Sequence, residues 1–198
     1  AIEYWSHAAA WIPLEDYRYC LPRMERIRRR GHEWFKVDAK VVRAVRARLK
    51  AEGPLRVQDF EKRPPGSQGW WDWKPSKLGL EYLFHCGEVA SLGRTGFQKV
   101  YDLAERVLPP GLDLSMPTEK EMAEWYLETA QRTLGVFRRR DIAYMRKDLT
   151  GGIGAALEAR VEDGRLVELG IEGLDARETW YASPAALEAA ASAPRPRA

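Results

Sequence analysis

The stretch from Trp70 to Leu103 constrains the fold of this chain more than any other part of its sequence. Lys74-Pro75-Ser76-Lys77 opens a helical pattern, because proline is tolerated in the first turn of a helix, and we expect this helix to run to Gly87. Two short apolar segments follow, separated by a Gly-Arg-Thr-Gly tetrapeptide that is typical of a hairpin turn. The expected strands are 89–92 and 97–101, with the turn at 93–96. A helix that leads directly into a small β-hairpin is the outline of a winged helix, a helix-turn-helix unit with a hairpin behind it.

The same outline occurs twice in the chain. Residues 53–60 (GPLRVQDF) match residues 135–142 (GVFRRRDI) without gaps and share the pattern Gly-x-apolar-Arg-x-x-Asp-apolar. Residues 87–93 (GEVASLG) match residues 164–170 (GRLVELG) in the same way. Both matches fall at predicted junctions, after the first helix and before the hairpin of each copy, which favours a true repeat over chance.

The predicted fold class is α+β and mostly helical, with two tandem winged-helix domains. Asp38 is placed to cap the first helix of the first domain, and Thr118 and Glu121 form a capping box at the start of the second. Leu108-Pro109-Pro110-Gly111 predicts the linker between them. The expected segments are a lead-in strand and basic helix at 1–36, winged helices at 37–110 and 115–185, and a fraying or disordered tail at 186–198.

Composition excludes several classes of protein. Hydrophobic residues make up 45% and charged residues 31% of the chain, as in a soluble globular protein. No apolar run approaches the roughly 20 residues that a membrane span needs, and no signal peptide is visible, so we expect a cytoplasmic protein without membrane contact. The two cysteines and three histidines lack zinc-ligand spacing, and neither a P-loop nor a nucleotide fingerprint occurs. We therefore expect no metal ion and no other cofactor.

The charge of the chain is unevenly distributed. Its net charge is +3, but residues 1–112 carry 20 Lys and Arg against 14 Asp and Glu, whereas residues 113–198 carry 12 against 15. The first part of the chain is therefore the better candidate for binding a polyanion such as nucleic acid.

The first domain offers the clearest candidates for contacts with DNA. A winged helix usually places its third helix in the major groove and its hairpin on the DNA backbone or in the minor groove. Lys74 and Lys77 begin the expected third helix, where cations oppose the helix dipole, so a phosphate held jointly by lysines and backbone amides would account for them. The candidate contacts are Lys74, Ser76, Lys77 and His85 in the helix and Arg94 and Lys99 in the hairpin. Glu81 lies on the same face of the helix and would repel phosphate. The alternative is that this face is an ordinary solvated helix surface.

Further basic residues are weaker candidates. Arg28, Arg29 and Arg30 end the lead-in helix, where they would either contact phosphate or form a solvated face. In the second domain, Arg138, Arg139 and Arg140 lie in the second helix, but the expected hairpin there is acidic. An acidic hairpin argues against the usual docking on DNA, and a packing or protein-contact role is the alternative for this domain.

Trp70, Trp71 and Trp73 form a conspicuous aromatic cluster just before the third helix of the first domain. Exposed aromatic rings would stack on bases. The alternative is that these side chains anchor the loop to the hydrophobic core.

Several segments resemble the YcaQ/AlkZ family of winged-helix DNA glycosylases. They are EYWSHA at 3–8, WWDWKPSK at 70–77, EYLF at 81–84, Gly87-Glu88 and GFQKVYDL at 96–103. The resemblance implies DNA repair by a hydrolase that cleaves the N-glycosidic bonds of bulky alkylated bases and interstrand crosslinks. It also implies double-stranded DNA as the partner, and tandem winged helices, usually three, followed by a β-rich region.

The catalytic motif of that family does not occur among the glutamines of this chain. The motif is Gln-apolar-Gln or Gln-apolar-Asp, and Gln58, Gln68, Gln98 and Gln131 do not form it. We therefore predict no catalytic residue and expect a DNA-binding piece of a longer glycosylase, holding the second and third winged helices. A monomer is favoured because no dedicated dimerisation helix stands out. The alternative function is a non-enzymatic DNA-binding module such as a transcriptional regulator.

Overall fold

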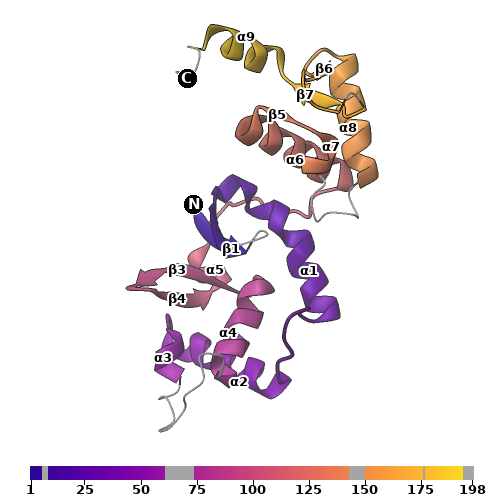
Figure 1. Ribbon diagram of the computed structural model, residues 1–198. Helices are drawn as coiled ribbons and strands as arrows, with labels where there is room; N and C mark the ends of the chain where they lie inside the picture. Colours follow the sequence, from indigo (N-terminus) through magenta and orange to yellow (C-terminus); the bar gives the residue numbers. More distant parts are fainter. Residues whose placement is uncertain (6–8, 61–73, 143–149, 176, 194–198) are drawn as a thin grey trace. The chain divides into compact units, whose positions relative to one another are not determined.

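The computed structural model describes residues 1–5, 9–60, 74–142, 150–175 and 177–193 (Figure 1). The chain is of mixed α+β class and divides into two compact units, residues 1–116 and residues 117–198. Within the described ranges, no helix has the length and apolar character required to cross a membrane. The predicted tryptophan cluster at 70, 71 and 73 lies outside the described residues.

The first unit consists of helices packed against two small antiparallel sheets. Its elements are β1 (Ile2–Trp5), β2 (Ala9–Ile12), the 3-10 helix η1 (Leu14–Cys20), α1 (Leu21–Arg30), α2 (Ala39–Glu52), α3 (Val57–Phe60), α4 (Pro75–His85), β3 (Val89–Thr95), β4 (Gln98–Leu103) and α5 (Ala104–Val107).

Local signals set the ends of α2. The carboxylate of Asp38 accepts a hydrogen bond from the backbone N–H of Lys40 at 2.7 Å, as the predicted N-cap requires. Gly53 closes the helix with φ +83°, a conformation that costs glycine little. Arg106 of α5 then donates to the carbonyls of Leu49 and Lys50, which satisfies acceptors that the helix end leaves open.

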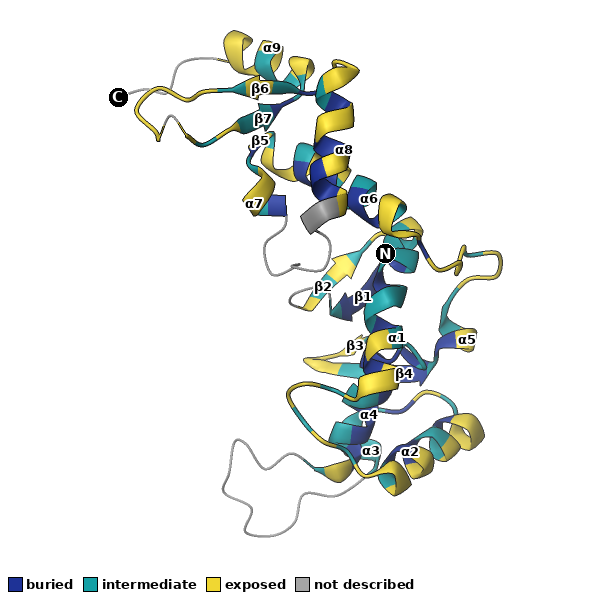
Figure 2. Ribbon diagram, turned by 90° about the vertical axis from the view of Figure 1, so that its right-hand side faces the viewer, coloured by how far each residue is buried: buried dark blue, intermediate teal, exposed yellow. Residues whose placement is uncertain are grey.

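The core of the first unit lies between α2, α4 and the β3–β4 hairpin (Figure 1). Leu80, Leu83 and Phe84 of α4 are almost completely buried, as is Leu49 of α2. Gly79 allows α4 to approach α2 closely, because a Cβ there would lie 3.1 Å from a methyl group of Val45. Burial colouring shows these inward faces in blue and the outer face of α2 in yellow (Figure 2).

The hairpin differs in detail from the prediction. The chain turns between Thr95 and Gln98, two residues later than expected, and Gly96 takes the left-handed conformation of this turn with φ +60°. The expected turn residue Gly93 lies inside β3 instead, where the register shifts. Leu55 forms an isolated antiparallel bridge with Tyr101, which ties the α2–α3 connection to β4.

Residues 1–30 share the core of the first unit. The expected lead-in strand is present as β1, and it pairs with β2, which we did not predict. Met24 of α1 is fully buried and lies against Gly87, whose φ of +70° and crowded Cβ position both require glycine. The hydroxyl of Tyr4 donates to the carbonyl of His85 at 2.9 Å, which joins β1 to the end of α4.

The second unit repeats the element order of α2 to β4. Its elements are α6 (Glu119–Leu134), β5 (Val136–Phe137), α7 (Arg139–Ile142), α8 (Thr150–Glu162), β6 (Val167–Leu169), β7 (Trp180–Ala182) and α9 (Pro184–Ser192). The strands form an antiparallel sheet in the order β5-β7-β6. The predicted capping box of Thr118 and Glu121 is confirmed, with both reciprocal hydrogen bonds present.

The repeated motif has one structural role in both units. In the first unit, the Asp59 carboxylate accepts from the backbone N–H and the guanidinium of Arg56 at 2.7–3.1 Å. In the second unit, Asp141 accepts in the same way from Arg138 at 2.9–3.0 Å. Each pair closes the turn that begins the short second helix, so the repeat is architectural.

Candidate nucleic-acid interface

A cavity of about 460 Å³ lies at the start of α4, between that helix, α3 and the β3–β4 hairpin. Four of the predicted DNA contacts line it: Lys74, Lys77, Arg94 and Lys99. Glu81 is the only carboxylate among the described residues that line it. The cavity lies at the N-terminal end of an 11-residue helix, where the helix dipole adds positive potential. The arrangement therefore suits an anion.

A buried carboxylate from β1 offsets part of this positive charge. Glu3 is only 3% exposed, and it accepts from Arg94 Nη2 at 2.6 Å and Nε at 3.2 Å. Lys99 Nζ lies 3.6 Å from the same carboxylate and 4.2 Å from the centre of the Phe84 ring. The hydrogen bonds to Glu3 and its negative charge raise the pKa of Arg94, so the guanidinium stays charged. Sequence reasoning missed Glu3, because no local pattern links it to residues more than 90 positions away.

The tip of the hairpin carries an exposed aromatic ring. Phe97 is 98% exposed, and its carbonyl accepts from Arg94 Nη1 at 3.0 Å. This ring also lines the cavity, and it was not among the predicted site residues. The signal available in the sequence was an aromatic residue directly after the turn glycine Gly96.

The expectation that His85 shares an exposed face with Lys77 is wrong. His85 is 3% exposed, because Trp5 of β1 and His32 of the α1–α2 loop cover the C-terminal end of that helix face. Burial, and then the neighbouring charges of His32 and Arg23, lower the pKa of His85 to about 3, so its imidazole is neutral near pH 7.

Ser76 is also buried rather than exposed, at 4% of its full accessibility. Only the N-terminal half of the predicted polar face, from Lys74 to Glu81, reaches solvent in the described structure. The lysines and the hairpin cations therefore form the accessible part of the predicted set.

Arg28, Arg29 and Arg30 do not line this cavity. Arg28 donates to the carbonyl of Cys86 at 2.9 Å and to Glu25 at 2.8 Å, so it ties α1 to the end of α4. Arg29 also pairs with Glu25, whereas Arg30 lines a separate cavity.

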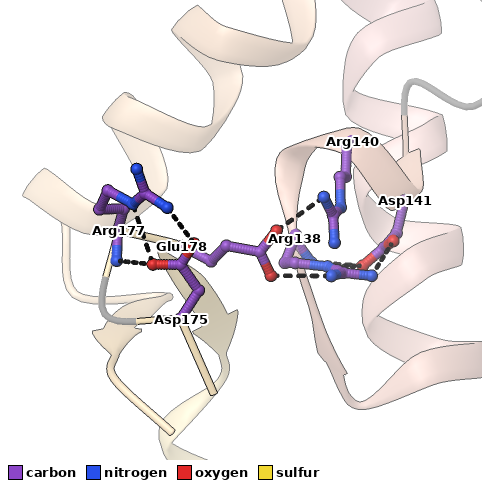
Figure 3. A network of polar contacts seen from close by, with 6 residues as sticks. All are labelled: Arg138, Arg140, Asp141, Asp175, Arg177 and Glu178. Carbon is purple, nitrogen blue, oxygen red and sulfur yellow. Dashed lines mark hydrogen bonds and ion pairs between the residues drawn. The ribbon is translucent and has the colours of Figure 1, made fainter.

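The basic cluster of the second unit is largely paired with carboxylates (Figure 3). Arg138 contacts both Asp141 and Glu178 at 2.9 Å and lies over the ring of Trp180 at 4.4 Å. Arg140 pairs with the other oxygen of Glu178 at 2.6 Å. Arg139 is exposed, and its guanidinium lies close against the backbone of α8 at Gly154. The negative partners thus offset much of the charge that the sequence suggested for this unit.

Comparison with known proteins identifies the family. No solved structure matches this chain. The sequence model of the family described as "DNA glycosylase AlkZ-like" matches residues 1–198, that is, the whole chain. Membership in a DNA glycosylase family implies contact with DNA and a role in DNA repair. The resemblance found in the sequence is confirmed, and the chain belongs to the AlkZ-like family of DNA glycosylases.

Proposed function

We propose that this chain is the DNA-binding part of a glycosylase that hydrolyses the N-glycosidic bonds of bulky alkylated or crosslinked bases. In this proposal both repeats are winged helices, and the chain binds double-stranded DNA as a monomer. The observation that carries the proposal is the convergence of Lys74, Lys77, Arg94 and Lys99 on one cavity at the start of α4.

The order of elements supports a winged-helix mode of binding. In each unit a long helix is followed by a short strand or bridge, a one-turn helix, a further helix and an antiparallel hairpin. In a winged helix the last of these helices enters the major groove, and the hairpin follows the backbone. We place α4 in the groove with Lys74 and Lys77 on phosphates, and Arg94 and Phe97 of the hairpin beside the adjacent backbone.

The second unit is assigned a different role. Its hairpin segment carries Glu172, Asp175 and Glu178, and the last of these holds Arg138 and Arg140. Phosphate would have to displace these carboxylates at a cost in desolvation and lost ion pairs. We therefore assign duplex binding to the first unit, and a packing or protein-contact role to the second.

Bond hydrolysis is assigned to residues other than those of the cavity. A glycosylase must stabilise an oxocarbenium-like sugar and place a water molecule, which a Gln and Asp pair can do without a metal ion. The four cations of the cavity can bind phosphate, whereas the Gln-apolar-Gln or Gln-apolar-Asp motif that the family uses for catalysis is not formed by the glutamines of this chain. The chain by itself is therefore expected to bind DNA without releasing a base.

Titration of a fluorescent 20-base-pair duplex at several salt concentrations tests the proposal. We expect weak binding that falls steeply with salt, with a log–log slope of about −0.9 for each phosphate neutralised. The same samples, incubated with a duplex that carries a bulky N7-alkylated guanine, should release no free base. Binding that does not depend on salt concentration would contradict the proposed phosphate contacts. Release of a free base would contradict the proposal that this chain binds DNA without hydrolysing the N-glycosidic bond. Protection of one specific operator sequence by a dimer would favour a transcriptional regulator instead.

A further inference from the structure

A second cavity in the first unit has no role in the proposed duplex contact. Its volume is about 660 Å³, within the range of roughly 300–1,000 Å³ typical of small-ligand sites. Its walls come from the loop between α1 and α2, the first turns of α2, and Tyr82 and Glu88 at the end of α4. Among the residues that the structure describes, it shares none with the lining of the cavity at the start of α4.

The charge of this second cavity is strongly positive. Arg30, Lys36, Arg43 and Arg46 line it together with one carboxylate, that of Glu88. Glu88 forms an ion pair with Arg46, whose Nη2 lies 2.5 Å from Glu88 Oε2. The other three cations are exposed and make no ion pair with any residue that the structure describes. Three positive charges around one concave surface favour a ligand that carries phosphate.

Aromatic rings line the same cavity. Phe35 stacks on His32 with a centroid distance of 4.1 Å and an angle of 20°. Tyr82 contributes a second ring, and Val37 and Val42 add apolar surface. A phosphate group alone would make no use of this surface, whereas a nucleobase would.

We propose that this second cavity binds one unpaired nucleotide of a single DNA strand, with the base against Phe35 and the phosphate among Arg30, Lys36 and Arg43. Cations beside aromatic rings are the combination by which proteins hold single strands without sequence preference. The site extends the proposed function, because a duplex opened around a damaged base exposes unpaired nucleotides. It does not depend on the duplex contact, since the two cavities are separate.

The test measures binding of a labelled eight-residue oligothymidine to the full chain and to Phe35→Leu and Arg43→Gln. Loss of base stacking in Phe35→Leu should weaken binding about tenfold. Loss of one phosphate contact in Arg43→Gln should reduce the salt slope by about 0.7. Lys50→Gln, an equal charge change at the exposed C-terminal end of α2 and outside the cavity, is the matched control and should bind like the parent chain. Circular dichroism and thermal melting establish that each variant is folded.

A second oligonucleotide separates this site from the duplex contact. A 2-aminopurine at its centre should change fluorescence on binding to the parent chain, and this change should disappear in Phe35→Leu. Lys74→Gln combined with Lys77→Gln should lose duplex binding and keep single-strand binding. Folded Phe35→Leu and Arg43→Gln variants that bind the single strand as tightly as the parent would overturn the proposal. Equal loss of single-strand binding in the Lys74 and Lys77 variant would overturn it as well.

Discussion

Replacement of Glu3 by glutamine removes one negative charge from beneath the β3–β4 hairpin and keeps the shape of the side chain. Glu3 is 3% exposed, and it holds Arg94 at 2.6 Å and Lys99 at 3.6 Å. The side chain of Lys99 is only 13% exposed, so its charge would remain poorly solvated without the carboxylate, whereas that of Arg94 is 40% exposed. The substitution therefore separates the stability of the unit from its affinity for DNA.

The size of the stability effect follows from these contacts. Removal of one partner from a buried ion pair costs about 3–5 kcal/mol. The loss here is smaller, because the Arg94 guanidinium can be solvated by water and Lys99 keeps its cation–π contact with the Phe84 ring. The glutamine side chain also still offers a hydrogen-bond acceptor. We expect a loss of about 2–3 kcal/mol in the free energy of unfolding and, for a unit of this size, a fall in Tm of about 8–12 °C.

The effect on DNA binding should have the opposite sign. With Glu3 neutral, Arg94 and Lys99 present their full charge to a phosphate, so duplex affinity at low salt should rise and the salt slope should steepen by up to about 0.9. Urea unfolding and duplex titration on the same preparation measure both quantities. Glu105→Gln, an equal charge change on the exposed surface of α5, is the control. A Glu3→Gln chain with the parent's unfolding midpoint and duplex affinity would refute the role assigned to this carboxylate.

Three further predictions concern the scaffold. Gly79→Ala should destabilise the first unit by up to about 2 kcal/mol in urea unfolding, because the new Cβ would lie 3.1 Å from a methyl group of Val45 and this crowding outweighs the roughly 1 kcal/mol that alanine gains over glycine in a helix; unchanged stability would mean that the Val45 side chain moves aside at little cost. Stability should fall as the pH drops from about 6.5 towards 3, by up to about 1.4 kcal/mol per pH unit, because burial keeps the pKa of His85 near 3 while the unfolded histidine takes up a proton. His85→Gln should flatten that pH profile, and an unaltered profile would assign it to other groups. Asp141→Ala should cost about 1 kcal/mol by leaving the backbone N–H of Arg138 without its acceptor, as thermal melting against a control at the exposed carboxylate Glu172, Glu172→Ala, would show.

Features of the fold that depend on neighbouring residues could be predicted from the sequence. Asp38 and the pair of Thr118 and Glu121 cap their helices as expected, since capping needs only residues up to three positions apart. The hairpin was expected two residues too early, because Gly93 and Gly96 are both compatible with a turn and only the register across β4 decides between them.

The candidate site was predictable only in part, because its accessibility depends on contacts between distant segments. Lys74 and Arg94 do line one cavity, as the helix and hairpin assignments implied. The burial of His85 depends on its contact with β1, which lies about 80 positions earlier in the sequence, and the periodicity within α4 cannot reveal such a contact. For the same reason the partners of Arg138 and Arg140 were not predicted, since Glu178 lies some 40 residues from them.

The most direct test of this account is the salt dependence of duplex binding by a chain with Lys74→Gln and Lys77→Gln. Both lysines line the cavity at the start of α4, and removal of both charges should reduce the log–log salt slope by about 1.8 and weaken binding markedly at low salt. Lys120→Gln with Arg132→Gln makes the same charge change on the exposed surface of α6 and should leave the slope unchanged. A lysine variant that binds the duplex with the affinity and slope of the parent chain would contradict the assignment of this cavity to DNA.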